Sequence, residues 1–183
     1  MSNTQIVLLG IAAAFLFWAV GAYNRLMALR NSILRRFARY EEQFALRHAL
    51  LLEHLDGALQ ASAAPHDAAP AEQAQEWRAL RAACLQAQHA CTATRARPVE
   101  AGSIRSLRMA EQILQEAIGR AQQTLPSLPG MADLSRQLAI CETGLQFARQ
   151  QFNEAARDHD QAVRQFPTLL LARMFGFGTA GTL

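Results

Sequence analysis

The feature that most constrains this chain is an uncharged apolar run close to its start. Residues 6–22 read IVLLGIAAAFLFWAVGA and contain no charged or strongly polar side chain. A run of 17 residues is at the lower limit of what spans the hydrocarbon core of a bilayer as an α-helix. Every face of this segment is apolar, whereas a helix that packs on a soluble core keeps a polar face. The run therefore predicts a transmembrane anchor over residues 1–22.

The charges on either side of the run predict its orientation. The five residues before it have no charged side chain, whereas arginine recurs over the 25 residues after it, at Arg25, Arg30, Arg35, Arg36, Arg39 and Arg47. Because basic flanks stay on the cytoplasmic side, we expect a single-pass protein with the N-terminus outside and everything after residue 22 in the cytoplasm. The residues expected at the membrane interface are then Trp18, Tyr23, Arg25 and Arg30.

A cleaved signal peptide is the alternative interpretation of the same run. Val20-Gly21-Ala22 supplies the small residues that a signal peptidase needs. A signal peptide, however, begins with basic residues, and this chain has its arginines after the apolar run instead. The order of charges therefore favours an anchor that is not cleaved.

The helical pattern continues past the anchor, since no proline occurs before residue 65. Apolar residues recur at steps of three, four or seven, the spacing of one helix face, at Leu26, Ile33, Phe37, Tyr40, Phe44, Leu51, Leu55 and Ala58. We expect one helix from the anchor to about residue 62. Arg30, Arg47 and His54 fall on or beside this stripe, and we expect their stems to pack at its edge while their polar ends stay in water.

Three more amphipathic helices are expected, separated by segments rich in proline and glycine. A loop over 61–72 leads to a helix over about 71–94, and residues 95–103 lead to a helix that ends near residue 125. Their apolar faces comprise Trp77, Leu80, Cys84, Ala87 and Cys91 in the first, and Ile104, Leu107, Leu114, Ile118, Ala121 and Leu125 in the second.

The fourth helix, after a turn at 124–130, has the most regular stripe. It steps by four and three through Leu134, Leu138, Cys141, Leu145, Ala148, Phe152, Ala155, His159, Ala162 and Phe166. Such a stripe is typical of helices packed in a bundle or coiled coil. Short connections between four helices predict an all-α fold, in which the anchor continues into an antiparallel, up-down-up-down four-helix bundle over residues 23–166.

The tail over residues 167–183 is unusually apolar. In an up-down-up-down bundle the fourth helix returns to the membrane, so we expect the tail to be membrane-proximal. One interpretation is an interfacial segment over Leu169–Phe177, with Leu170, Phe175 and Phe177 in the lipid and Arg173 near anionic headgroups. The alternative is that the tail folds back and caps the bundle.

The residue types that catalysis requires are scarce or isolated. All 18 basic residues are arginine, which removes Schiff-base chemistry and any phosphate-loop lysine. Cys84, Cys91 and Cys141 have neither the spacing of a disulfide framework nor that of a zinc site. His159 is the one polar member of its stripe, and we expect it to serve packing. We therefore expect no enzyme, cofactor or metal site.

The charge balance bears on partners. The formal net charge of +3 comes largely from the arginines that follow the anchor, and no basic stripe for nucleic acid is present in the rest. We expect membrane lipid as one partner and a protein as another, a second copy of the chain included.

The chain resembles the LemA family of bacterial membrane proteins at both ends. Near the anchor the resemblance lies in Tyr23 and Asn24; in the fourth helix and tail it lies in Ala148, Arg149, Asn153, Phe166, Pro167, Phe175, Gly176 and Phe177. The sequence departs from the family pattern in the first helix, which lacks a proline-containing run, and at His159-Asp160, where the family tends to have Tyr-Asn. These departures indicate a divergent branch.

The resemblance implies a single-pass protein of the bacterial inner membrane with a cytoplasmic helical bundle, and it does not imply an enzyme. The leading hypothesis is therefore a bundle that presents its helix faces for protein interaction or assembly. The alternative hypothesis is a lipid-binding or membrane-shaping factor, acting through the juxtamembrane arginines and Leu169–Phe177.

Overall fold

A computed structural model of the chain describes residues 3–62, 71–124 and 131–183. This part of the chain is entirely helical apart from its connections and its last residues. It contains α1 (Asn3–Ser62), α2 (Ala71–Arg95), α3 (Ala101–Thr124), α4 (Met131–Arg164) and α5 (Thr168–Met174). The predicted tip loop and the turn after Thr124 fall largely on residues 63–70 and 125–130, outside the described residues.

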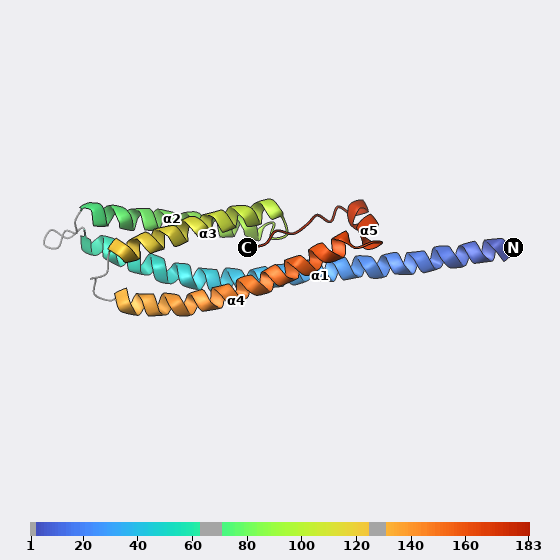
Figure 1. Ribbon diagram of the computed structural model, residues 1–183, viewed down its shortest axis with the longest axis horizontal. Coiled ribbons are helices and arrows are strands. Elements are labelled where there is room, and N and C mark those ends of the chain that lie inside the picture. The colour runs from blue at the N-terminus through green and yellow to red at the C-terminus, as the bar shows by residue number, and fades with distance from the viewer. Residues whose placement is uncertain (1–2, 63–70, 125–130) are drawn as a thin grey trace.

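The anchor and the first bundle helix form one unbroken helix, as the sequence predicted. α1 has 60 residues and extends beyond the other helices at its N-terminal end (Figure 1). At 1.5 Å per residue it is about 90 Å long. All side chains from Asn3 to Phe17 are exposed, and the buried stripe begins at Leu26. The same helix thus changes from exposed apolar surface to a face that packs on other helices.

The helices pack as two pairs that share one core. α1 packs along α4, α2 packs along α3, and α1 also contacts α2 (Figure 1). The predicted faces of α1 and α2 are confirmed, since all their members are buried except Ala58, which is half-buried. In α3, Leu125 lies outside the described residues, and the other predicted members are buried or half-buried.

The predicted buried stripe of α4 is correct along the middle of the helix and wrong at its C-terminal end. Leu145, Ala148, Phe152, Ala155, His159 and Ala162 are buried, and Leu134, Leu138 and Cys141 are half-buried. Phe166, by contrast, is 81% exposed. The helix ends at Arg164, so the periodicity that would have turned Phe166 inward no longer applies.

The backbones of α3 and α4 do not approach each other closely within the described residues, and the end of the chain lies between the first turn of α3 and the second half of α4. Gly181 rests against the first turns of α3, and Ala180 is 8% exposed and part of the common core. On the α4 side, Asn153 exchanges two hydrogen bonds with the backbone of Leu183, at 2.8 and 3.0 Å, and Asp160 accepts one from the Ala180 N–H at 2.6 Å.

α5 covers the junction between the anchor and α4. Leu171 and Ala172 are buried, and Ala172 packs with Leu26 of α1 and with Ala162 and Val163 of α4. Gly176 then has a φ of +71°, a conformation that glycine adopts without strain, and it turns the chain toward the α3–α4 groove. The tail is therefore held at two places, by α5 and by residues 180–183.

We predict that Gly181→Ala lowers the free energy of unfolding by about 1–3 kcal/mol, the usual cost of overpacking. A Cβ atom at residue 181 would lie 2.9 Å from the Cα of Ala101, which belongs to the backbone and cannot swing away. Gly178→Ala is the matched control, because a Cβ atom there meets nothing within 4 Å. Chemical unfolding of the full-length protein in detergent measures both; equal stabilities would contradict the packing of the tail.

Candidate functional site

The centre of the bundle contains charged side chains from three helices. Arg47 of α1 is 1% exposed, and its Nη2 donates to Oε1 of Glu111 on α3 at 2.9 Å. Its Nη1 donates to Oε2 of Glu142 on α4 at 3.0 Å. Arg149 of α4 donates to the other carboxylate oxygen of Glu111. We call these four residues the charge cluster.

The charge cluster connects α3 and α4 in the part of the bundle where the tail does not lie between them. Glu111 is 4% exposed, and each of its carboxylate oxygens accepts from a guanidinium of a different helix. Removing one partner of a buried ion pair leaves an uncompensated charge and costs about 3–5 kcal/mol. The cluster therefore fixes the register of α1, α3 and α4 relative to one another.

Two groups beside Glu111 respond to its charge. Burial, and then the negative charge of Glu111, raise the pKa of the buried Tyr40 hydroxyl well above its ordinary value. Burial by itself would lower the pKa of Arg149, but Glu111 and Tyr40 outweigh burial and raise it. At neutral pH the phenol is thus neutral and the guanidinium charged, as the ion pairs require.

His48 adjoins the cluster in a fixed orientation. Its ring stacks on Phe44 with the ring centroids 3.7 Å apart, and its Nδ1 donates to the Phe44 carbonyl at 2.9 Å. Burial first, and the neighbouring Arg47 second, lower its pKa to about 4. The imidazole is therefore neutral at physiological pH, and protonating it would place a second cation beside Arg47.

The prediction for Arg47 was wrong. We expected its guanidinium in water at the edge of the α1 stripe, but the structure buries it, because carboxylates from α3 and α4 neutralise it there. Glu111 and Glu142 were not expected to be part of a site. One signal was available for Glu111: it lies four residues after Leu107 and three before Leu114, within a buried face. A positive charge in the buried face of α1 and a negative charge in that of α3 together form the pattern that would have indicated the Arg47–Glu111 ion pair.

The cysteines are core residues, as expected for Cys84 and Cys91. Both are buried, and burial raises the pKa of Cys84 to about 11 and that of Cys91 to about 12, so neither is a thiolate at neutral pH. Among the described residues, no three His, Cys, Asp or Glu side chains gather so as to hold a metal ion.

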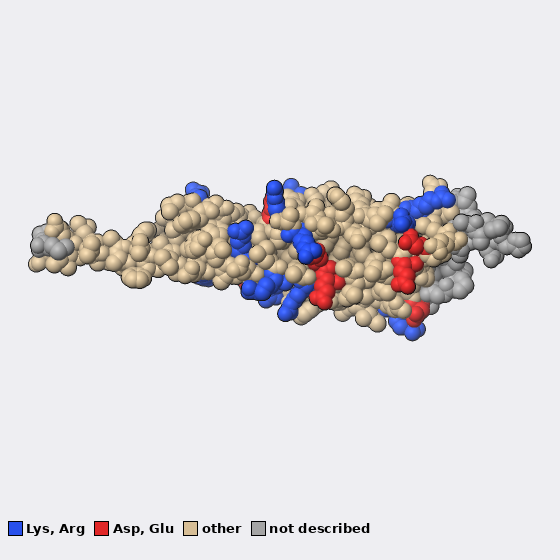
Figure 2. All heavy atoms as spheres, turned by 180° about the vertical axis from the view of Figure 1, so that it is seen from behind, with Lys and Arg blue, Asp and Glu red and all other residues tan. Residues whose placement is uncertain are grey.

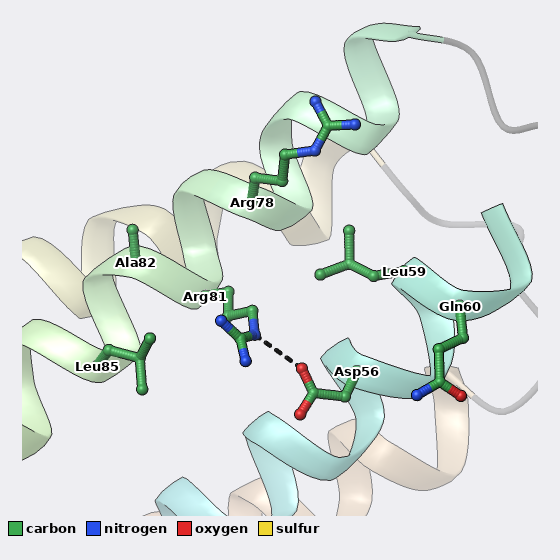
Figure 3. Close-up of a pocket in the computed structure, with 7 residues that line it drawn as sticks. All are labelled: Asp56, Leu59, Gln60, Arg78, Arg81, Ala82 and Leu85. Carbon is green, nitrogen blue, oxygen red and sulfur yellow. Dashed lines mark hydrogen bonds and ion pairs between the residues drawn. The ribbon is translucent and has the colours of Figure 1, made fainter. Parts of the chain in front are cut away.

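An open hollow of about 630 Å³ lies between the ends of α1 and α2 that are farthest from the anchor (Figure 3). Its polar centre is the ion pair between Arg81 Nε and Asp56 Oδ1, 2.7 Å apart, with both side chains about half exposed. Exposed pairs of this kind contribute little to stability or binding. No role was predicted for these residues from the sequence, and their geometry indicates no specific role either.

The residues predicted at the membrane interface fall into two groups. Tyr23, Phe175 and Phe177 come together, with ring centroids of Tyr23 5.2 Å from Phe175 and 6.1 Å from Phe177. Leu170, Arg173, Arg25 and Arg30 are exposed on the same part of the molecule, where α5 contacts α1. Trp18 is half-buried and packs against Phe15 instead, one turn farther along the anchor.

The residues that carry the family resemblance have structural roles in α4 and the tail. Ala148 is buried in the core, Arg149 belongs to the charge cluster, and Asn153 holds Leu183. The LemA family model matches residues 85–183, which is more than half of the chain. The chain belongs to the LemA family. The matched region contains the whole of α3, α4 and α5, and hence every member of the charge cluster except Arg47.

Further comparisons give no additional relatives. No curated protein and no solved structure is significantly similar to the chain. We therefore infer the roles of individual residues in this LemA-family protein from the contacts that they make in its own structure.

We predict that Glu111→Gln lowers the free energy of unfolding by about 3 kcal/mol, because it leaves Arg149 and part of Arg47 without a counter-charge in the interior. Glu116→Gln, on the exposed face of the same helix, removes the same charge and should change stability by less than about 0.5 kcal/mol. Urea unfolding of both variants at pH 7 provides the measurement. A loss below about 1 kcal/mol for Glu111→Gln would show that the cluster does not hold the helices together.

We predict that His48 makes the protein less stable as the pH falls. Its folded-state pKa, about 4, lies below the value of 6.5 for an unperturbed histidine, so between these values the unfolded chain binds a proton that the folded chain does not. From pH 7 to about pH 4.5 this costs about 2–3 kcal/mol. In His48→Gln the fall in stability should be smaller by that amount. His89→Gln, at an exposed position, should keep the wild-type profile; identical profiles for all three proteins would refute the assignment.

Proposed function

We propose that this LemA-family protein is a non-enzymatic, single-pass protein of the bacterial inner membrane. Its N-terminus lies outside, and an antiparallel, up-down-up-down helical bundle over residues 23–166 lies in the cytoplasm and presents surfaces for protein interaction. One observation carries the proposal: α1 is a single helix that is apolar and exposed at one end and packed into the bundle at the other. Such a helix joins an anchor rigidly to a recognition domain.

Charge and exposure support the placement of the anchor. Residues 3–60 form the one helix in the described part of the chain that is long and apolar enough to cross a membrane. The large apolar side chains between Ile6, which is 56% exposed, and Phe17, which is 76% exposed, are all more than half exposed. On the face in Figure 2 the narrow N-terminal end carries no charged residue, and arginines begin where the molecule widens. Exposed apolar surface on this scale is typical of lipid contact.

The proposed protein-interaction surface lies on α4. Ile140 and Phe147 are seven residues apart, and therefore on one helix face, and they are 68% and 63% exposed. Aromatic side chains of this kind are enriched among the residues that dominate binding energy at interfaces. A partner helix, from another protein or from a second copy, would bury both side chains at once.

The alternative function, lipid binding or membrane shaping, is favoured by the surface of α5. Leu170, Met174 and Phe175 are 59%, 75% and 53% exposed, and Arg173 is exposed among them. Tyr23, at the end of the anchor, contacts Phe175, which would place this surface at the lipid interface. Leu and Phe would enter the bilayer and Arg173 would meet anionic headgroups.

Photo-crosslinking in native membranes separates the two functions. We expect a crosslinker at Ile140 to capture a protein, and the additional change Phe147→Ser to weaken capture about tenfold, since losing one aromatic anchor costs more than about 1.4 kcal/mol. Gln146→Ser, exposed on another side of α4, is the control. A crosslinker at Met174 tests the alternative by the formation of lipid adducts. Capture that Phe147→Ser leaves unchanged would exclude the α4 surface, and a Met174 probe that reacts only with water would exclude the α5 surface.

A further inference from the structure

A second hollow lies near the membrane-side end of the bundle and has the character of a binding site. It has a volume of about 400 Å³ and is formed by four separate segments. Arg30 and Leu34 come from α1, residues 96–101 from the connection between α2 and α3, His159 from α4, and residues 176–179 from the tail. We call it the base pocket. Arg30 lies eight residues beyond the end of the predicted anchor, about 12 Å along the helix.

His159 is the residue that the packing of the bundle does not explain. It is 1% exposed and lines the base pocket, yet neither ring nitrogen has a hydrogen-bond partner among the described residues. Its Nδ1 lies 3.6 Å from Oδ1 of Asp160, beyond hydrogen-bond distance, and that oxygen already accepts from the Ala180 N–H. A buried imidazole without partners costs free energy unless a ligand or solvent completes its bonding.

The other polar groups of the base pocket favour a negatively charged ligand. Arg30 and Arg97 contribute two guanidinium groups against the single carboxylate of Glu100, and the Arg97–Glu100 pair is exposed and long, at 3.4 Å. α3 begins at Ala101, which lines the same wall, and the first N–H groups of a helix have no acceptor within it, although that of Ile104 already donates to the Glu100 carbonyl. Helix N-termini and arginines together bind oxyanions.

The apolar part of the wall restricts the ligand further. Leu34, Pro98, Val99 and Phe177 line the pocket beside the cationic groups. A small phosphate ester would set its phosphate against Arg30, Arg97 and the start of α3, and its organic part against this wall. The imidazole of His159 is neutral because burial lowers its pKa, which the adjacent Arg30 reinforces and Asp160 opposes. A neutral ring offers one N–H donor and one acceptor, enough for a phosphate oxygen and a hydroxyl.

We propose that the base pocket binds a phosphate group, carried either by an anionic phospholipid headgroup or by a soluble phosphate ester, through Arg30, Arg97, the N-terminus of α3 and His159. The tail closes one side of the site with residues 176–179. Because Asp160 and Asn153 hold the tail at residues 180 and 183, α4 both carries His159 and, through the polar face beside it, keeps that wall in place.

The proposal is tested on the full-length protein by thermal unfolding in two settings. In detergent micelles, inorganic phosphate is compared with chloride at equal ionic strength; in nanodiscs, phosphatidylcholine is compared with a mixture of phosphatidylcholine and phosphatidylglycerol. We expect saturating ligand to raise Tm by about 5 °C in at least one setting. A shift in micelles identifies soluble phosphate as a ligand, and a shift confined to nanodiscs identifies the lipid headgroup.

Variants locate the effect. The double variant Arg30→Gln, Arg97→Gln changes two exposed side chains of the pocket and should abolish the shift. Arg25→Gln removes a charge nearer the anchor, outside the base pocket, and should preserve it. The absence of any shift, a shift that survives in the double variant, or one that Arg25→Gln abolishes as well would each overturn the proposal. The assay involves no protein partner, so its outcome is independent of crosslinking through Phe147.

Discussion

The arrangement of the bundle depends on one buried carboxylate. Glu111 accepts from Arg47 with one oxygen and from Arg149 with the other, and these arginines belong to α1 and α4. Hydrophobic contact specifies how deeply helices pack, but it tolerates sliding by a turn, because one apolar face resembles the next. A buried charge tolerates no such slip, since moving Glu111 by 5.4 Å would leave it and Arg149 without partners and would remove one of the two partners of Arg47. The charge cluster thus selects one alignment among several of similar apolar burial.

α3 and α4 remain apart because α4 turns a polar face toward the space between them. Glu142, Arg149, Asn153 and Asp160 recur at steps of seven, four and seven, which places them on one face beside the apolar stripe. Each has a partner on another element: Arg47 of α1, Glu111 of α3, and the backbone of Leu183 and Ala180 in the tail. Two polar helix faces would not exclude water from each other. Long ion-paired side chains at one end and an extended segment of backbone at the other fill the space instead.

Most of the helices could be predicted from the sequence, because periodicity is a property of each helix alone. The end of α1 was expected near residue 62, and α2 was expected at about 71–94, both within one residue of the structure. What periodicity cannot show is which charge on one helix meets which charge on another. Arg47 was therefore assigned to water. Phe166 was assigned to the core because its spacing continued the stripe, although the backbone leaves the helix before reaching it.

The base pocket could not be predicted from the sequence, for a related reason. Its lining comes from four segments that span residues 30 to 179, and no local pattern connects Arg30 with Arg97 or either with His159. The sequence did identify His159 as an anomaly in an apolar stripe, and the structure shows why the residue is exceptional: it is buried, and neither ring nitrogen has a hydrogen-bond partner in the part of the chain that the structure describes. The polar row of α4 runs from the charge cluster to Asp160, which adjoins His159. Within this row Glu142 and Arg149 belong to one ion-pair network, and Asn153 and Asp160 hold the same tail, so the effects of substitutions within each pair on stability should not be additive. α4 therefore bonds both to the charge cluster at the centre of the bundle and to the tail at its base, whereas α1 meets the tail through Tyr23 and α5.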